Sequence, residues 1–250
     1  MNKYLFFAKQ MVISSGRRVL SFSQDINKCV VCDEECAVIP LCGCCKSKYF
    51  SVPEPGKDFC SFCGKQLISE KEICMECRKD VLLRHLDGVF PLFSYRLWNT
   101  GLLCRWKLEG ERALSDLFSE LMNERLIQLK RKFGDFVIVP VPPRPGKIRE
   151  KGWDQVEELC TFLEYRYNWK VQRILKRISS VEQKSLDRNH RMDIIGKAYT
   201  LCDKVKSVPG IVCLLDDVLT TGSTLECCAK VLKENGVESV YASAIFTVDR

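Results

Sequence analysis

The sequence of 250 residues contains no apolar run that approaches the roughly 20 residues needed to cross a lipid bilayer. A secretory leader is also missing, since the apolar stretch 5–8 is followed at once by Lys9 and Gln10 and has no cleavage-like end. There is no low-complexity segment, and no internal repeat apart from duplicated cysteine pairs. These absences predict a cytoplasmic protein with no membrane partner, in which thiols stay reduced.

Histidine is scarce, because the chain has only 2, and His85 and His190 both lie outside the cysteine pairs. We therefore assign neither to a metal site and expect each in an ordinary surface or core position. Apolar residues are not scarce: hydrophobic types make up 46% of the chain, which favours a packed core over disorder. The length suits one domain of ordinary size with a smaller one, or a single large domain.

Charge is mildly unbalanced, with 39 Lys and Arg against 32 Asp and Glu, which gives a net charge of +7. This balance favours a partner that carries phosphate, and it does not choose among a nucleotide, a phosphosugar and a nucleic acid. An oligomeric state does not follow from the sequence.

Cysteine is abundant, with 16 in all and ten of them between Cys29 and Cys77. Most of these ten form C-x2-C pairs, a spacing typical of metal ligands more than of a disulfide framework. Two sets of four thiols fit two tetrahedral zinc sites, which would be structural because no position is left open for water. The first set is Cys29, Cys32, Cys42 and Cys45, and the second set is Cys60, Cys63, Cys74 and Cys77.

Alternatives to this pairing are open at the level of the sequence. The first and third pairs could share one metal in a cross-braced arrangement, or one set could have lost its metal, so that one zinc is bound instead of two. Cys36 and Cys44 are spare thiols near the first set. A redox or iron–sulfur role is the weaker alternative, because the strict four-pair spacing favours zinc.

Composition divides the chain into three parts. Residues 1–28 form a basic lead-in, which we expect to be a helix docked on the rest of the protein rather than on a membrane surface. Residues 29–78 contain both cysteine sets, separated by the turn-rich segment 51–57. Residues 79–250 have the composition of an ordinary globular domain.

Hydrophobic periodicity in this last part alternates between helix and strand. Helical spacing occupies 101–133, with an interruption at Gly110, then 153–167 and 222–235. The segment 179–193 is polar and irregular. Strands are expected at 136–141, 171–178, 198–202, 211–215 and 240–248. This alternation predicts an α/β fold with a mainly parallel sheet flanked by helices.

The strongest functional motif is IVCLLDDVLTTGST at 211–224. An apolar run typical of a strand buried on both faces delivers Asp216 and Asp217 to its end, where ligands bind in open α/β sheets. Hydroxyl residues around Gly222 then open a helix, whose N–H groups and dipole make an anion site. Both features fit one ligand if it carries phosphate at one end and a diol in the middle. The purely structural alternative is a strand–turn–helix corner, with Asp217 and Thr221 as turn and capping residues.

This motif resembles the phosphoribosyl pyrophosphate (PRPP) signature of the type I phosphoribosyltransferases. The segment VPVPP at 139–143, the basic stretch 144–151 and GWDQ at 152–155 resemble one branch, the ComF-type (competence protein F) family. Further matches to that branch are Gln183, Leu186, Arg191, Ala198 and Tyr199. Lys151, Trp153-Asp154 and Ile194 depart from the family residues, and these departures concern the second substrate and the catalytic loop, not the ribose-phosphate site.

The resemblance implies a type I phosphoribosyltransferase-like domain and a set of site residues. Asp216 and Asp217 would bind the ribose hydroxyls and steady positive charge on the reacting carbon, while Lys184 and Arg188 would close over the diphosphate as part of a mobile catalytic loop. Mg2+ would accompany PRPP, and the cysteine sets would form a double zinc ribbon. The implied PRPP-binding residues are Thr220, Thr221, Gly222, Ser223, Thr224, Pro142, Pro143, Arg144, Lys147 and Lys151.

The implied reaction is displacement of pyrophosphate from PRPP by an acceptor that the sequence does not identify, in a protein linked to DNA uptake or nucleotide metabolism. A second interpretation is a non-catalytic accessory protein that holds single-stranded DNA through its zinc ribbons and basic loops, with PRPP or another ribose 5-phosphate as a regulator. Nucleobase salvage is a third, but it needs a base-recognising hood that only the cysteine region could supply.

Overall fold

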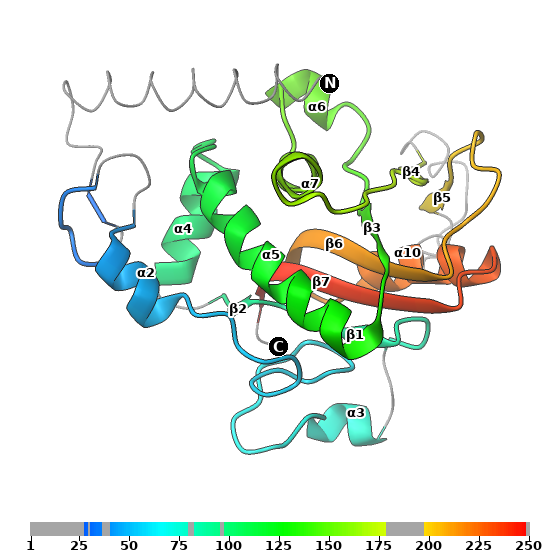
Figure 1. Ribbon diagram of the computed structural model, residues 1–250, viewed down its shortest axis with the longest axis horizontal. Helices are drawn as coiled ribbons and strands as arrows, with labels where there is room; N and C mark the ends of the chain where they lie inside the picture. Colours follow the sequence, from blue (N-terminus) through cyan, green and yellow to red (C-terminus); the bar gives the residue numbers. More distant parts are fainter. Residues whose placement is uncertain are drawn as a thin grey trace, which may run out of the picture.

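The computed structural model describes residues 28–29, 31–36, 41–79, 83–95, 98–178 and 198–248. Its centre is a sheet with the strand order β1-β7-β6-β3, and β2 pairs further along β7 (Figure 1). Every pair in this sheet is parallel, which confirms the predicted α/β class with a mainly parallel sheet. The strands are β1 (Gly88–Val89), β2 (Phe93–Ser94), β3 (Val137–Pro140), β6 (Ile211–Leu219) and β7 (Ser239–Thr247).

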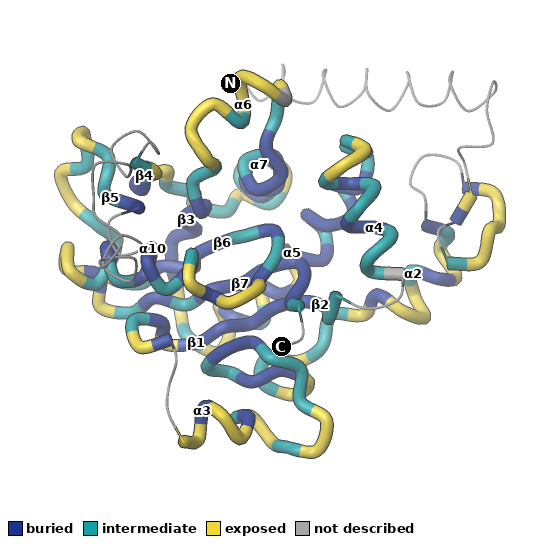
Figure 2. Tube along the Cα trace, turned by 180° about the vertical axis from the view of Figure 1, so that it is seen from behind, coloured by how far each residue is buried: buried dark blue, intermediate teal, exposed yellow. Residues whose placement is uncertain are grey.

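Alternation along β6 explains why both faces of the sheet are covered. Cys213 and Leu215 belong to the apolar cluster on one face, and Val212 and Leu214 to the cluster on the other, because successive strand side chains point to opposite faces. Figure 2 shows the central strands as a buried layer. The first face is covered by α4 (Trp98–Lys107), α5 (Leu114–Phe133) and α7 (Gln155–Tyr167), and the second by α10 (Ser223–Glu234).

The helices follow the predicted spacing and local signals. Gly110, with φ +72°, lies between α4 and α5 and ends the first of them, as expected. α7 begins at Asp154, whose carboxylate accepts a hydrogen bond from the Glu157 N–H at 3.0 Å. It ends at Asn168, which takes the left-handed conformation common at helix ends.

Four strands differ clearly from the sequence prediction. β6 extends to Leu219, because its pairing with β7 continues through Asp216 and beyond. Within 171–178, β4 occupies only Leu175–Arg177, and it pairs antiparallel with β5 (Tyr199–Leu201) in a separate sheet. β1 and β2 were not predicted, since two residues each are too few to show a period of two.

The cysteine region attaches to the domain in two places. α2 (Gly43–Tyr49) contains Cys45 of the first set and α3 (Met75–Lys79) contains Cys77 of the second, and the two helices lie well apart in Figures 1 and 2. The first set shares an apolar cluster with Phe50 on the α5 face, whereas the second set belongs to the cluster on the α10 face. Each set therefore packs against its own part of the sheet domain, and the predicted boundary between 78 and 79 stays a prediction.

Two predictions concern the chain ends and the membrane. The lead-in 1–28 lies outside the described residues except for Lys28. Of the helices in the described ranges, none combines the length and the apolar character that a bilayer crossing requires.

Candidate functional site

A cleft of about 600 Å³ opens where β3 and β6 end at the carboxyl edge of the sheet. This edge is where open α/β sheets bind ligands. The predicted site residues that line the cleft are Asp216, Asp217, Thr220, Thr224, Pro142, Pro143, Arg144 and Lys147. Fold topology thus brings together two motifs that are about 70 residues apart in the sequence.

The acidic pair lies on the last part of β6. Asp217 is 7% exposed, and its carboxylate forms an ion pair with Lys107 at the end of α4, at 2.8 Å. The Asp217 N–H donates a hydrogen bond to Asp216 Oδ1 at 2.8 Å. Burial and the neighbouring Asp217 charge raise the pKa of Asp216 to about 8. Asp216 therefore retains its proton to a much higher pH than an ordinary carboxyl group.

The phosphate loop (Thr220–Thr224) joins β6 to α10. Gly222 precedes the helix with φ +77°, a conformation that favours glycine, and it provides no side-chain cap. The Thr221 hydroxyl lies 2.8 Å from the Ser223 hydroxyl and accepts a hydrogen bond from the Ser223 N–H at 3.3 Å. The helix N-terminus and these hydroxyl groups together make a corner suited to an anion.

The basic stretch after β3 is balanced by acidic neighbours. Arg144 forms an ion pair with Glu150 across the short helix α6 (Lys147–Lys151). Lys147 is paired with the buried carboxylate of Asp154 and donates to Gln155 Oε1 at 2.9 Å. Both basic groups line the cleft while held by carboxylates, so an incoming anion would compete with Glu150 and Asp154 for them.

Several cleft residues were missed by sequence reasoning. Lys107, Arg177, Tyr95 and Tyr199 all line the cavity, and the Arg177 guanidinium lies 5.6 Å from the centre of the Tyr199 ring. Lys107 carries only the signal of a helix end, and Arg177 that of a strand. Their approach to Asp216 and Asp217 depends on how distant segments pack, which no local pattern encodes.

Three predicted site residues are not placed here. Lys184 and Arg188 lie outside the described residues, as does Gln183. Lys151 ends α6, but its side chain is not described. Thr221, Gly222 and Ser223 form the phosphate loop without lining the cleft itself.

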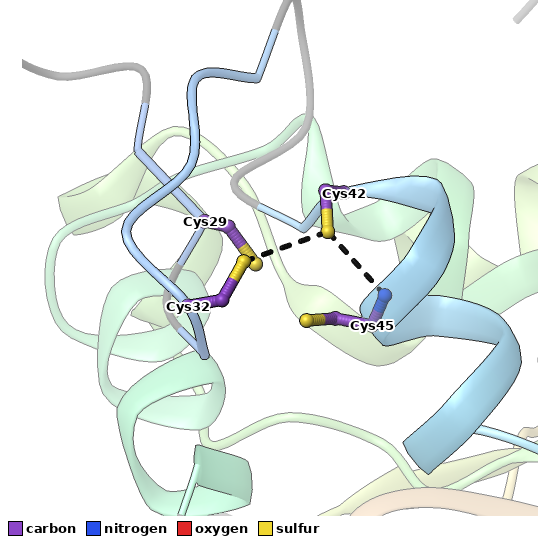
Figure 3. Close-up of side chains that lie close together, drawn as sticks. All are labelled: Cys29, Cys32, Cys42 and Cys45. Atoms are coloured by element: carbon purple, nitrogen blue, oxygen red, sulfur yellow. Dashed lines mark hydrogen bonds between the residues drawn. The ribbon is translucent and has the colours of Figure 1, made fainter.

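The first cysteine set brings four thiols together (Figure 3). The sulfur atoms of Cys29, Cys32, Cys42 and Cys45 all lie within 4.8 Å of one another, and Cys32 Sγ is 3.7 Å from Cys42 Sγ. A tetrahedron with Zn–S bonds of about 2.3 Å has sulfur–sulfur edges of about 3.8 Å, so the set matches zinc. The Cys45 N–H donates a hydrogen bond to Cys42 Sγ at 3.3 Å.

The second cysteine set has the same arrangement and is buried throughout. Cys63 Sγ lies 3.7 Å from Cys74 Sγ, and the Cys74 N–H donates to Cys60 Sγ at 3.3 Å. A hydrogen bond from Cys63 lowers the pKa of Cys60 to about 4 and raises the pKa of Cys63. The two sets assemble in chain order, so the cross-braced alternative is wrong. Each could hold one zinc ion.

Comparison with known proteins gives relatives over most of the chain. No family model matches the sequence. Competence protein ComFC of Streptococcus pneumoniae is 25% identical over 211 residues, which cover 83% of this chain and 86% of that protein. Competence protein F of Haemophilus influenzae is 26% identical over 210 residues, covering 80% and 87%. Competence protein ComFC of Bacillus subtilis is 25% identical over 221 residues, covering 84% of each.

Proposed function

Because this chain belongs with the ComF-type competence proteins, we propose that it serves DNA uptake or a related step by binding PRPP, or another ribose 5-phosphate ligand, with Mg2+. The observation that carries the proposal is the meeting of the acidic pair, the phosphate loop and basic side chains in one cleft. A ligand with a diol between two phosphate groups matches these three features in one binding mode.

The phosphate loop would bind the 5-phosphate. It lies at the N-terminus of α10, where first-turn N–H groups and the helix dipole favour an anion, and its hydroxyls supply further donors. Asp216 and Asp217 would accept hydrogen bonds from the ribose hydroxyls. Their oxygen atoms are also of the kind that Mg2+ prefers, and a bound magnesium would offset negative charge on the diphosphate.

The basic groups would receive the diphosphate end. Arg144 and Lys147 lie beside the Pro142–Pro143 turn, and each would exchange a carboxylate partner for a phosphate oxygen. Lys107 would keep the site from accumulating negative charge, since it neutralises Asp217 before the ligand arrives. The chain thus supplies binding, orientation and electrostatic stabilisation, which suffices for displacement of pyrophosphate when an acceptor is present.

The proposal is tested by calorimetric titration of PRPP with Mg2+. We expect the wild-type protein to bind and the Asp216→Asn/Asp217→Asn variant to lose at least about tenfold in affinity, because amides replace both carboxyl groups that would bind the ribose hydroxyls and Mg2+. Asp135→Asn is the matched control, since Asp135 is 86% exposed and lies at the amino-terminal end of β3, away from the cleft. Equal affinity in all three proteins would contradict the assignment.

A second candidate function is binding of single-stranded DNA as an accessory protein. It is favoured by the names of the relatives and by α2, where the Lys48 ammonium lies 5.1 Å from the centre of the Tyr49 ring, which is 40% exposed. Aromatic and basic side chains together suit unstacked bases and phosphates. Salt-dependent binding of an oligonucleotide without release of pyrophosphate from PRPP would favour this candidate.

A further inference from the structure

We propose that the second cysteine set, through Gly64, positions the phosphate loop, so that metal binding at this set and ligand binding in the cleft are coupled. The inference rests on the proposed function, since it assumes that the loop binds phosphate. It concerns the knuckle between Cys60 and Cys77 and the two elements that flank the loop, β6 and α10. Gly64 would act as a positioning residue and not as a ligand of either the metal or the sugar.

The first contact joins the knuckle to the end of β6. A Cβ atom added to Gly64 would lie 2.5 Å from Leu219 Cδ2 and 3.0 Å from Val89 Cγ1, so the knuckle backbone touches both side chains directly. Gly64 has φ +70°, which allows this close approach at the residue after Cys63. Leu219 is 2% exposed and immediately precedes Thr220, which lines the cleft.

The second contact joins the knuckle to the edge of the sheet. The Val89 N–H donates a hydrogen bond to the Ser61 carbonyl at 2.7 Å, so the knuckle continues the pairing of β1. Leu219 is held from its other side, because its carbonyl accepts a hydrogen bond from the Val248 N–H at 2.8 Å. Leu219 therefore has little freedom to move unless the knuckle moves.

The third contact joins the segment after the knuckle to the start of α10. The Glu226 carboxylate, in the first turn of α10, accepts hydrogen bonds from the N–H groups of Arg84 at 2.9 Å and His85 at 3.0 Å. The His85 ring nitrogen also lies 2.6 Å from Glu226 Oε1. The strand before the phosphate loop thus contacts the knuckle itself, and the helix after the loop is bonded to the segment that follows the knuckle.

The first cysteine set has no comparable position. It packs with Phe50 against the α5 face, and the neighbouring Lys46 forms an ion pair with Glu120 at 2.6 Å. None of these residues lines the cleft or flanks the phosphate loop. The coupling is therefore expected at the second set alone, and the first set provides an internal comparison.

Coupling of this kind follows from linkage. A knuckle closed on its metal holds Leu219 and the first turn of α10 in place, which keeps the N–H groups of the loop arranged for phosphate. If metal binding at one site raises the ligand affinity of the other by some factor, ligand binding raises the metal affinity by the same factor, commonly about five-fold or more. Sugar phosphate in the cleft should likewise slow the loss of metal from the second set.

The test compares Gly64→Ala with Gly56→Ala. Gly56 has φ +85° and no atom within 4 Å of an added Cβ, so this control carries similar backbone strain without the contact to Leu219. Hydrogen–deuterium exchange of the peptide covering 216–226 should be several-fold faster in Gly64→Ala than in Gly56→Ala, with zinc content measured in both. Affinity for PRPP with Mg2+ should fall about five-fold or more in Gly64→Ala alone.

A reciprocal measurement leaves every cysteine and glycine in place. Leu219→Ala should speed the release of one of two zinc ions to a chelator, whereas Leu129→Ala, an equally buried truncation on the other face of the sheet, should not. Exchange that is equal in the two glycine variants, or equal zinc release in the two leucine variants, would overturn the inference. Wild-type protein that fails to bind PRPP would instead sink the proposed function, because the exchange and zinc-release comparisons need no ligand.

Discussion

Asp216 is the residue on which the chemistry of the free site depends most. Burial and the adjacent Asp217 raise its pKa from the ordinary 3.8 to about 8. Between these two values the unfolded chain has released the proton while the folded protein retains it. Stability contributed by this residue is therefore fully present below about pH 4 and is lost as the pH rises toward 8.

Asp216→Asn should consequently stabilise the protein without Mg2+ by about 1–2 kcal/mol at pH 8 and by less at pH 6. The amide oxygen can still accept the hydrogen bond from the Asp217 N–H, so the local geometry is kept. Urea unfolding at the two pH values measures the difference, with Asp135→Asn as a control that should show no such pH dependence. A variant that is less stable than wild type by the same amount at both pH values would refute this account of Asp216.

Individual residues also show where sequence reasoning reaches its limit. Asp216, Asp217 and Thr220 could be predicted because strand, acidic pair and hydroxyl loop follow one another within 14 residues. Lys107 could not, because its role depends on the packing of α4 beside β6, and the two charges are 110 positions apart in the sequence. The ion pair of Lys147 with Asp154 could not be predicted either, since Asp154 had been noted only as a departure from a family pattern.

At the scale of elements, the two cysteine sets form two structurally separate sites. Each combines two short knuckles whose N–H groups point at sulfur, and neither has an open position for water. A structural metal in such a set contributes several kcal/mol to folding, because the loops have little core of their own. The spacing alone predicted which four thiols come together in each set, since a C-x2-C knuckle presents two sulfurs to one point.

Metal analysis of the purified protein should find two zinc ions per chain. Cys60→Ser should retain about one and lower the unfolding temperature, because a ligand at the buried second set is lost. Cys44→Ser is the matched control, since Cys44 is exposed and belongs to neither set, and it should retain both ions. Well under one zinc per wild-type chain would rule out the zinc assignment.

Short strands that depend on long-range pairing were harder to predict than elements long enough to show a hydrophobic period. The helices α5 and α7 and the strand β6 carry enough turns or residues to show their spacing. β1 and β2 exist only because β7 offers its second edge to them. A single strand was expected at 171–178. Instead, the chain leaves the edge of β3 after the bridge between Ile138 and Val171, and β4 pairs with β5.

At the scale of the whole molecule, the sheet and the second cysteine set meet beside the cleft, whereas the first set packs elsewhere on the sheet domain. The parallel sheet directs the ends of β3 and β6 to the same edge, and Gly64, next to the second cysteine set, packs against Leu219 just before the phosphate loop. The parallel architecture was predictable from alternating strands and helices. The separate attachment of the two cysteine sets was not, because spacing determines which thiols share an ion and says nothing about the surface on which they pack.

The most direct test of the central claim is a crystal structure of the protein with ribose 5-phosphate and Mg2+. We expect the phosphate group at the N–H groups of Thr220–Thr224 and both ribose hydroxyls within hydrogen-bond distance of Asp216 or Asp217. Sugar phosphate bound elsewhere, with the cleft at the end of β6 filled only by solvent, would contradict it.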